Sequence, residues 1–542
     1  MAPRPEHNRQ FVRVDERFMH LRRAGRGPAL VMLHQSPQNS RMWLDEFEHL
    51  AQRYTVIAPD LPGFGYSQPL PGQPDIGELS TAVHGLLDAL GIESCVLFGM
   101  HTGAIVAVYM GLQRPGRVAG VVTDGYACFT DEERSLFDER YLPPFEPTWD
   151  GGHLRWLWAR MREQLFFFPW YEKRAQYALR LPAPSPERTQ AMVDDILRCG
   201  DHYRAGYRAA LGFADRDCVA DLTVPARLVY RDDDVLSRHL ERLPDRPDHV
   251  FAERVADRGE LWSVLEAFVD SLDLPEADIE KPKSVMAVDR FIVDTVFGPV
   301  AAWRSGSSQW LKSSQSLKLI IHAPGQAPPG LTEHDSDSEY TTVVVELPGH
   351  GASVEVSDAP LTVPAMAGAL AKVVNAVDPD APVAIEAHGA ATPIAIVLTE
   401  ELSERARSLH LVRPWLLDDI EIRYFLDHLP DPAIHPAGGH LLEAWQWERE
   451  RHFFPPWLEP TGGNRRIGDA PSPAVCHDNC VTLIGLGDRL RELFEALLET
   501  PGLADRLYRV DCPVTLAFDE TDDPHERLTR LQAALAQKEL KK

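Results

Sequence analysis

The sequence repeats itself at an offset of about 287 residues, so the chain must take up a fold that can be built twice. Motifs of the first half return in the same order in the second half. They are Leu-Pro-Gly at 61–63 and 347–349, Gly-Gly-His-Leu at 151–154 and 438–441, and a Phe-rich run ending in Trp at 166–170 and 453–457. A period of this length corresponds to a whole domain, and several collinear matches indicate duplication and fusion.

The length of 542 residues also favours two domains, because a single hydrophobic core stops growing well below this size. Residues 274–283 are polar, bounded by proline and without periodicity, so they predict a linker. We therefore expect one domain at 1–273 and a second at 284–542. The second copy ends soon after Asp522, without counterparts of the last strand and closing helix of the first copy, and is predicted to be truncated.

The charge and the cysteine content limit which binding partners and which cellular compartment we expect. A formal net charge of −26 repels phosphate backbones and anionic membranes, so nucleic acid is not an expected partner. Residues 1–8 show no signal peptide and no apolar window is long enough for a bilayer helix, so no membrane partner is expected. Seven thinly spread cysteines form no disulfide framework, which favours the cytoplasm. The pair Cys476 and Cys480 lacks the second pair that zinc needs, so no metal site is predicted.

Short apolar runs alternate with amphipathic stretches in the first copy. Residues 29–33, 54–58 and 95–98 are bounded by turn formers, as buried parallel strands are. Their order predicts a doubly wound, mostly parallel α/β sheet. The aromatic-rich segment at about 129–221 interrupts this rhythm and is predicted to form a helical cap over the strand ends, with its counterpart at about 416–508.

The third of these runs leads into Gly-Met-His-Thr-Gly at 99–103, a pattern typical of a sharp strand-to-helix turn. Such a turn needs small residues two positions before and two positions after its exposed tip, and both glycines meet that need. The tip normally carries Ser, Asp or Cys, but here it carries His101. The second copy has His388 at the tip and Glu386 where a small residue is needed, so its turn is predicted to be degenerate.

Three motifs in this order resemble the α/β-hydrolase superfamily, most closely its branch of epoxide hydrolases, haloalkane dehalogenases and acyl-ester hydrolases. Besides the turn, His-Gln-Ser-Pro at 34–37 is similar to the family's His-Gly-x-Pro loop. Asp-Leu-Pro-Gly-Phe-Gly-Tyr-Ser at 60–67 is similar to its Asp-x-x-Gly-x-Gly-x-Ser motif. The resemblance covers nearly all of the first copy and implies two tandem α/β-hydrolase domains, each with a helical cap, the second one truncated.

The resemblance also implies roles for individual residues. The backbone N–H groups of Ser36 and Thr102 would form an oxyanion hole. Asp234 stands where the family carries its catalytic acid, and Arg258 stands nearest to the place of its catalytic histidine. A Ser-His-Asp mechanism is therefore excluded. His101 is left as base or nucleophile, with Asp234 to orient it and Arg258 to hold an anionic group of the substrate.

Further residues could contact a substrate, and each also has a structural explanation. Those of the first copy are His34, His153, Trp158, Phe167 and Trp170. The loop histidine could instead support its own loop by hydrogen bonds, and the cap residues could fill the core of the cap. In the second copy, the counterparts of the His–Asp pair are His388 and Asp522.

These patterns favour an enzyme without a cofactor that hydrolyses a small, partly apolar ester, thioester or related acyl compound, so a small-molecule substrate is the expected partner. Two alternatives stay open. A base beside an oxyanion hole also suits proton abstraction, elimination or C–C cleavage, as in lyases of this fold. The truncated second copy also suits a non-catalytic binding or scaffold protein, and the two copies could pack as an internal pseudo-dimer.

Overall fold

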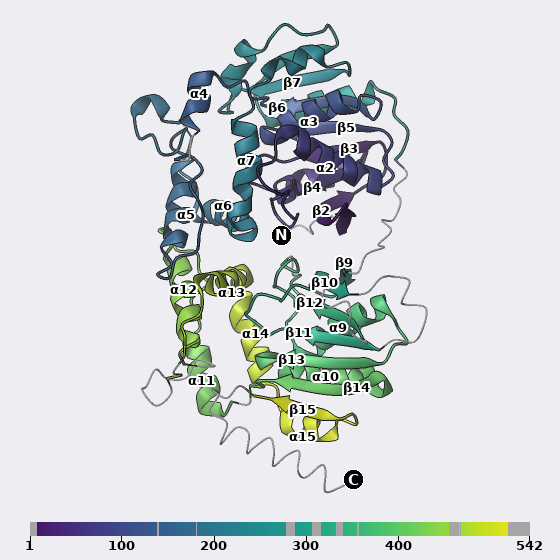
Figure 1. Ribbon diagram of the computed structural model, residues 1–542, viewed down its shortest axis with the longest axis vertical. Helices are drawn as coiled ribbons and strands as arrows, with labels where there is room; N and C mark the ends of the chain where they lie inside the picture. Colours follow the sequence, from purple (N-terminus) through teal and green to yellow (C-terminus); the bar gives the residue numbers. More distant parts are fainter. Residues whose placement is uncertain are drawn as a thin grey trace. The chain divides into compact units, whose positions relative to one another are not determined.

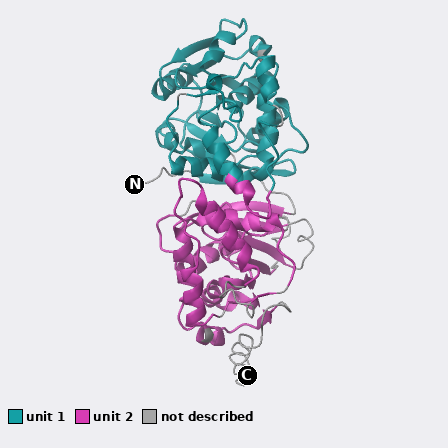
Figure 2. Ribbon diagram, turned by 90° about the vertical axis from the view of Figure 1, so that its left-hand side faces the viewer, with its two compact units in different colours: residues 1–146, 156–283 teal, residues 147–155, 284–542 magenta. Residues whose placement is uncertain are grey.

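The computed structural model describes residues 8–137, 140–179, 181–277, 288–305, 316–331, 340–354, 357–415, 417–454, 465–466 and 468–518. The chain divides into two compact units (Figure 2). Unit 1 comprises Met1–Glu146 and Trp156–Lys283, and unit 2 comprises Pro147–Arg155 and Ser284–Lys542. The end of the predicted linker at 274–283 falls outside the described residues.

Unit 1 is built on an eight-stranded sheet in the order β1-β2-β4-β3-β5-β6-β7-β8 (Figure 1). The strands are β1 Asn8–Val14, β2 Arg17–Ala24, β3 Ala29–Leu33, β4 Thr55–Pro59, β5 Cys95–Met100, β6 Val118–Asp124, β7 Ala226–Arg231 and β8 Val250–Val255. An antiparallel hairpin of β1 and β2 joins β4 antiparallel, and the other pairings are parallel. The predicted doubly wound, mostly parallel sheet is confirmed, and the hairpin adds an edge that the apolar runs did not indicate.

Helices cover both faces of this sheet, which is why its central strands are apolar on both sides. Every residue of β3, β4 and β5 is buried. The helices are η1 Ser40–Trp43, α1 Leu44–Leu50, α2 Ile76–Ala89, α3 Thr102–Gln113 and α8 Arg258–Asp270. On one face, Trp43, Phe47 and Leu265 share a core with Phe98 of β5. The face turned to the viewer in Figure 1 is covered by α2 and α3.

The segment between β6 and β7 is helical. It contains α4 Asp131–Leu136, α5 Gly152–Glu163, η2 Ala175–Tyr177, α6 Pro186–Cys199, η3 Gly200–His202, α7 Tyr203–Leu211 and η4 Arg216–Asp221. Thr130 and Ser185 begin α4 and α6 because their hydroxyl oxygens accept hydrogen bonds from first-turn N–H groups, each at 3.2 Å. The Tyr141 ring packs edge-on against Phe168 and Tyr207 and gives this segment an aromatic core.

Unit 2 has a seven-stranded sheet in the order β15-β14-β13-β11-β12-β10-β9. The strands are β9 Val288–Thr295, β10 Gly298–Ser305, β11 Leu317–Ile321, β12 Thr341–Val345, β13 Val383–His388, β14 Ala406–Val412 and β15 Val514–Ala517. Strand β10 pairs antiparallel with both β9 and β12, and the other pairings are parallel. This arrangement reproduces the strand order of unit 1 up to its seventh strand. Residues 519–542, which include Asp522, lie outside the described part of the chain.

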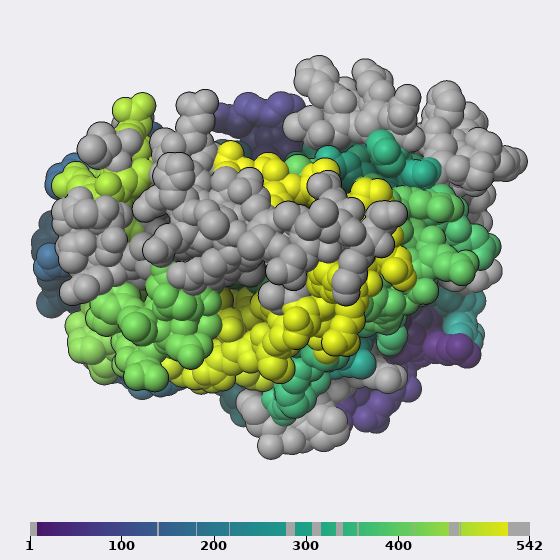
Figure 3. Space-filling model, turned by 90° about the horizontal axis from the view of Figure 1, so that it is seen from below, coloured from purple at the N-terminus to yellow at the C-terminus, as the bar shows by residue number. Residues whose placement is uncertain are grey.

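The helices of unit 2 follow the same plan. Those next to the sheet are α9 Val363–Val377, η8 Gly389–Ala391, α10 Thr392–Leu402 and η9 Ser403–Arg405. Those between β14 and β15 are α11 Asp419–Asp427, α12 Gly439–Arg451, α13 Pro473–Leu486, α14 Arg489–Leu498 and α15 Leu503–Arg509. Figure 3 shows the yellow surface of α14 and α15 beside the green of α11. None of the described helices combines the length and the apolar character needed to cross a membrane.

Each unit contains the same kind of hydrogen bond, between a loop histidine and a backbone N–H group, at corresponding positions. In unit 1, the backbone N–H of Leu61 donates to Nε2 of His34 at 2.8 Å. In unit 2, the backbone N–H of Leu347 donates to Nε2 of His322 at 3.2 Å. Both histidines are buried, so each provides the hydrogen-bond acceptor that a buried backbone N–H group needs.

The central strand of unit 2 differs from its counterpart because one of its faces is polar. β5 is buried throughout, whereas β13 alternates between buried and half-buried residues. The half-buried face carries Glu386 and His388, and Lys318 of β11 pairs with Glu386 at 2.9 Å. Alternation with a period of two is typical of a strand covered on one side. Glu386 and His388, the two polar residues of the second turn motif, therefore lie on the polar face of β13.

Candidate active site

His101 lies at the tip of a tight turn between β5 and α3, with φ 47° and ψ −104°. A residue other than glycine in such a conformation carries a strain of about 1–3 kcal/mol. The flanking glycines make the turn possible. A Cβ atom on Gly99 would lie 2.1 Å from the carbonyl oxygen of Gly103, and one on Gly103 would lie 2.2 Å from that of Leu33. The turn inferred from the glycine spacing is therefore present, and it presents its tip residue in a strained conformation.

The His101 imidazole is paired with Asp234, which comes shortly after β7. Nε2 of His101 lies 3.0 Å from each carboxylate oxygen of Asp234. The Asp234 side chain is 7% exposed and that of His101 is 21% exposed. The backbone N–H of Leu236 donates to the same carboxylate at 2.8 Å. No described residue forms a hydrogen bond with Nδ1 of His101, so the ring is anchored at one nitrogen and open at the other.

The two groups of this pair favour opposite charges. Burial favours the neutral imidazole, but the charge and hydrogen bond of Asp234 outweigh burial, so the pKa of His101 is raised from its ordinary value of 6.5. Burial likewise favours a protonated Asp234. The charge of His101 and the hydrogen bonds from His101 and Leu236 nevertheless lower the pKa of Asp234 to about 2. Asp234 is therefore a carboxylate at neutral pH and stabilises an imidazolium.

Three residues that the sequence motifs did not indicate surround the pair. Nη2 of Arg231 lies 3.4 Å from Asp234, and its Nε lies 3.0 Å from Asp124, which is buried at the end of β6. Gly125 has φ 72°, and a Cβ atom there would lie 2.9 Å from Cδ2 of His101, so only glycine leaves room for the ring. One signal was available: the pair Asp-Gly ends a parallel strand, at the sheet edge where functional residues gather.

The two residues predicted to form the oxyanion hole are hydrogen-bonded to each other. The backbone N–H of Ser36 donates to the hydroxyl of Thr102 at 3.3 Å, and that hydroxyl donates to Oγ of Ser36 at 2.9 Å. Both residues are buried. An oxyanion would have to displace the Thr102 hydroxyl to reach the Ser36 amide. The N–H of Thr102, in the first turn of α3, bonds to no described residue and lies at the positive end of the helix dipole.

Arg258 is held elsewhere in unit 1. It is the first residue of α8, where its guanidinium lies 2.9 Å from Glu46 of α1. The same guanidinium lies 5.8 Å from the ring centre of Trp43 and 5.6 Å from that of Trp262. These contacts fix Arg258 between α1 and α8, so the structure does not bring it to His101 for the predicted role in substrate binding.

The residues predicted to contact a substrate in unit 1 lie in the loop and the cap. His34 is fully buried, and both of its ring nitrogens bond to backbone groups, so it supports its loop. Trp158 is buried in α5. Phe167 and Trp170 lie before α6, where Nε1 of Trp170 donates to the carbonyl oxygen of Tyr141 at 3.0 Å. None of them forms a hydrogen bond with the His–Asp pair within the described residues.

His153 belongs to unit 2, because residues 147–155 are part of that unit. Its Nε2 lies 3.1 Å from Nδ1 of His477 on α13. The backbone N–H of Thr148 donates to its other ring nitrogen at 3.1 Å. Both nitrogens are thus used within unit 2, which leaves the predicted contact with a substrate of unit 1 without support in the structure.

The second tip histidine is in ordinary extended backbone. His388 has φ −110° and ψ 133°, and its Nε2 lies 2.9 Å from Glu386 on the same strand. The positive φ, 55°, falls on Gly389 instead. Glu386 stands at the position of Gly99, where a Cβ atom would meet the backbone of the unit 1 turn, so that turn cannot form here. Its predicted partner Asp522 lies outside the described residues.

Comparison with known proteins relates this site to a large family. Residues 28–237 match the family described as alpha/beta hydrolase fold. An epoxide hydrolase from Caballeronia sordidicola is 35% identical over 223 residues, which cover 36% of this chain and 66% of that protein. A pimeloyl-[acyl-carrier protein] methyl ester esterase from Shewanella sp. is 36% identical over 127 residues, which cover 23% of this chain and 45% of that protein.

A crystal structure of an epoxide hydrolase from Vigna radiata aligns over 49% of this chain and 98% of its own, with 20% identity and a TM-score of 0.39. The chain spans about half to two thirds of the length of the two curated relatives named above. The motif order, the mostly parallel sheet and the family match over residues 28–237 lead to one conclusion: unit 1 of this chain belongs to the α/β-hydrolase superfamily.

Proposed function

We propose that unit 1 hydrolyses a small acyl ester or a related acyl compound and that His101 is its general base. The observation that carries this proposal is the His101–Asp234 pair, with 3.0 Å between its polar atoms, at the tip of the strained turn. The relatives that match the chain include an epoxide hydrolase and a methyl ester esterase, both hydrolases by name.

In the proposed reaction, the Asp234 carboxylate accepts the Nε2–H of His101 and leaves the lone pair at Nδ1. Nδ1 takes a proton from a water molecule while the water oxygen bonds to the acyl carbon and the carbonyl electrons move to oxygen. The N–H of Thr102 donates to this oxyanion. The intermediate then breaks its bond to the leaving alkoxide, which receives the proton back from the imidazolium. Asp234 stabilises the imidazolium between the two proton transfers.

The raised pKa of His101 makes its imidazole a stronger base, but base and nucleophile both use the neutral Nδ1, so the two roles are distinguished by what forms on the ring. A nucleophilic His101 would form an acyl-imidazole at Nδ1. Single-turnover reactions quenched in acid and analysed by mass spectrometry distinguish the two roles, since only the nucleophilic route adds the acyl mass to the peptide that contains His101.

A second candidate is proton abstraction from a carbon atom, as in lyases of this fold. One observation favours it: the Ser36 amide is already bonded to Thr102, which weakens the hole that acyl transfer needs. The same base would act, without attack by water. Incorporation of deuterium from solvent into recovered substrate would support this candidate over ester hydrolysis.

For unit 2 we propose an origin by duplication of unit 1 and no chemistry at His388. The strand order and the loop hydrogen bonds of the two buried histidines support a common origin. The extended backbone of His388 and its bond to Glu386 support the loss of the catalytic turn.

The direct test is turnover of chromogenic esters of increasing acyl length by the wild type, His101→Ala and His388→Ala, across about pH 5 to 9. We expect His101→Ala to abolish turnover and His388→Ala to retain it. Turnover that does not depend on His101, or no turnover of any ester, would contradict the proposal and favour the lyase or binding alternatives.

A further inference from the structure

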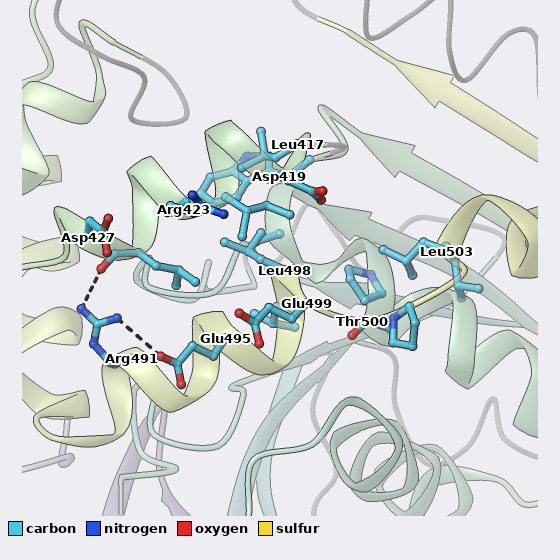
Figure 4. Close-up of a pocket in the computed structure, with 18 of the residues that line it drawn as sticks. Leu417, Asp419, Arg423, Asp427, Arg491, Glu495, Leu498, Glu499, Thr500 and Leu503 are labelled. Atoms are coloured by element: carbon cyan, nitrogen blue, oxygen red, sulfur yellow. Dashed lines mark hydrogen bonds and ion pairs between the residues drawn. The ribbon is translucent and has the colours of Figure 1, made fainter.

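Unit 2 contains a cavity of about 820 Å³ between α10, α11, α14 and α15 (Figure 4). Sites for small molecules span about 300–1,000 Å³, so the cavity is large enough for one. Ile396, Leu426, Leu498 and Leu507 line it, one from each of the four helices. Figure 4 shows Leu498, the last residue of α14, between Arg423 of α11 and Glu499. Apolar side chains from separate elements thus converge on one space.

The cavity lies beside the segment that replaces the catalytic turn. Ala390 and Pro393, just after the end of β13, are part of its wall. Trp415 also lines it, and the backbone N–H of Trp415 donates to the carbonyl oxygen of Gly389 at 3.3 Å. Ligands of parallel α/β sheets bind at the carboxyl ends of the strands. Unit 2 therefore has a cavity at such a strand end without the strained tip that would present a catalytic group.

The rim of the cavity is acidic. Its charged residues are Asp419, Arg423, Asp427, Arg491, Glu495 and Glu499. Arg491 is engaged, because it donates to the Leu426 carbonyl oxygen at 2.7 Å and lies 3.4 Å from Glu495. Within the described residues, the carboxylates of Asp419, Asp427 and Glu499 form no ion pair, and only the guanidinium of Arg423 is likewise unpaired. Among the described residues of the rim, carboxylates without an ion pair therefore outnumber such guanidinium groups by three to one.

We propose that this cavity binds an apolar amine, with the hydrocarbon body among the leucines and the ammonium group at the rim. Apolar burial drives entry of the body, and it is indifferent to the charge of the ligand. The rim supplies the selectivity, since excess carboxylates attract a cation and repel an anion. The net charge of −26 on the whole chain acts in the same direction. The site does not depend on the function proposed for unit 1.

The test uses the full chain and three ligands of equal chain length: n-decylamine, n-decanol and n-decanoate, each measured by isothermal titration calorimetry. We expect decylamine to bind most tightly and decanoate most weakly, and added salt to narrow the difference. Equal affinities, or tighter binding of decanoate, would overturn the choice of an amine. No binding of decylamine would overturn the proposal as a whole.

Variants locate the binding. Asp427→Lys and Glu499→Lys reverse exposed rim charges and should each weaken decylamine about two- to five-fold while leaving decanol unchanged. Glu404→Lys is the matched control, an exposed acid of η9 that does not line the cavity. Leu498→Trp fills the cavity and should abolish binding of all three ligands, with circular dichroism and thermal unfolding to verify the fold. Decylamine binding that persists in Leu498→Trp would place the site elsewhere and refute the assignment.

Discussion

Replacing Asp234 by asparagine removes one charge from the candidate site and keeps its shape. Two charges about 4 Å apart interact by about 4 kcal/mol at an effective dielectric constant of about 20. His101 is 21% exposed and Arg231 also neighbours the lost carboxylate, so we discount this to about 2–3 kcal/mol of imidazolium stabilisation. Asp234→Asn should therefore lower kcat/KM about 30- to 150-fold.

The same substitution changes the titration of His101. Burial lowers the pKa of His101, and the charge and hydrogen bond of Asp234 are the main influences that oppose it, so the variant should titrate at lower pH than the wild type. NMR titration of the imidazole, assigned with His101→Ala, measures this without any substrate. The acid limb of kcat/KM should move to lower pH together with the NMR value, because the neutral ring is the base.

Asp233→Asn is the matched control, because this carboxylate is 62% exposed and pairs with the same Arg231 at 2.5 Å. It should leave the rate and the titration of His101 close to those of the wild type. A rate and an imidazole titration in Asp234→Asn that equal those of the wild type would refute the proposed coupling.

The pair also makes stability depend on pH. The raised pKa of His101 adds stability that is fully present below pH 6.5 and is lost as pH rises through the folded value. The lowered pKa of Asp234 adds stability that is present above pH 3.8 and is lost as pH falls towards about 2. The difference in free energy of unfolding between the wild type and Asp234→Asn, measured with urea, should thus be largest between about pH 4 and 6.5.

Three further substitutions test the turn, the hole and the loop. Gly103→Ala places a Cβ atom 2.2 Å from a carbonyl oxygen and should lower the free energy of unfolding by more than about 2 kcal/mol. In the control Gly116→Ala, the added Cβ atom has nothing within 4 Å, so the melting temperature should stay unchanged. Thr102→Ala removes the hydroxyl that occupies the Ser36 amide and should raise ester turnover several-fold, and an unchanged kcat would exclude that amide from the hole. His34→Ala leaves a buried amide without its acceptor and should cost about 1–3 kcal/mol in urea unfolding, with an unaltered midpoint contradicting the assigned role.

The sheet and the turn could be predicted because local sterics determine them. Buried parallel strands need continuous apolar runs, and the turn needs glycine at positions 99 and 103, where any Cβ atom meets backbone. A few consecutive residues are enough to recognise both an apolar run and this spacing of glycines. The approach of Asp234 to His101 is a contact over 133 positions, and the family resemblance, not the local pattern, pointed to it.

The rest of the site depends on contacts that no local pattern encodes. The bond between Ser36 and Thr102 spans 66 positions and that between Asp124 and Arg231 spans 107. Arg258 was placed near the site by the family resemblance, but packing against aromatic rings decides where its side chain lies. In the second copy, two signals competed: the turn motif around residue 388, and the period-two alternation of β13, which matches the observed structure.

The location of the positive φ sets which mutations each unit tolerates. In unit 1 it falls on His101, so every residue other than glycine at this position carries the backbone strain. In unit 2 it falls on Gly389, where the same backbone conformation is nearly free of strain, and position 388 is an ordinary strand residue. Residue 388 can therefore change by neutral drift without loss of stability. If unit 2 is under selection for binding, the residues around its cavity should vary less than residue 388.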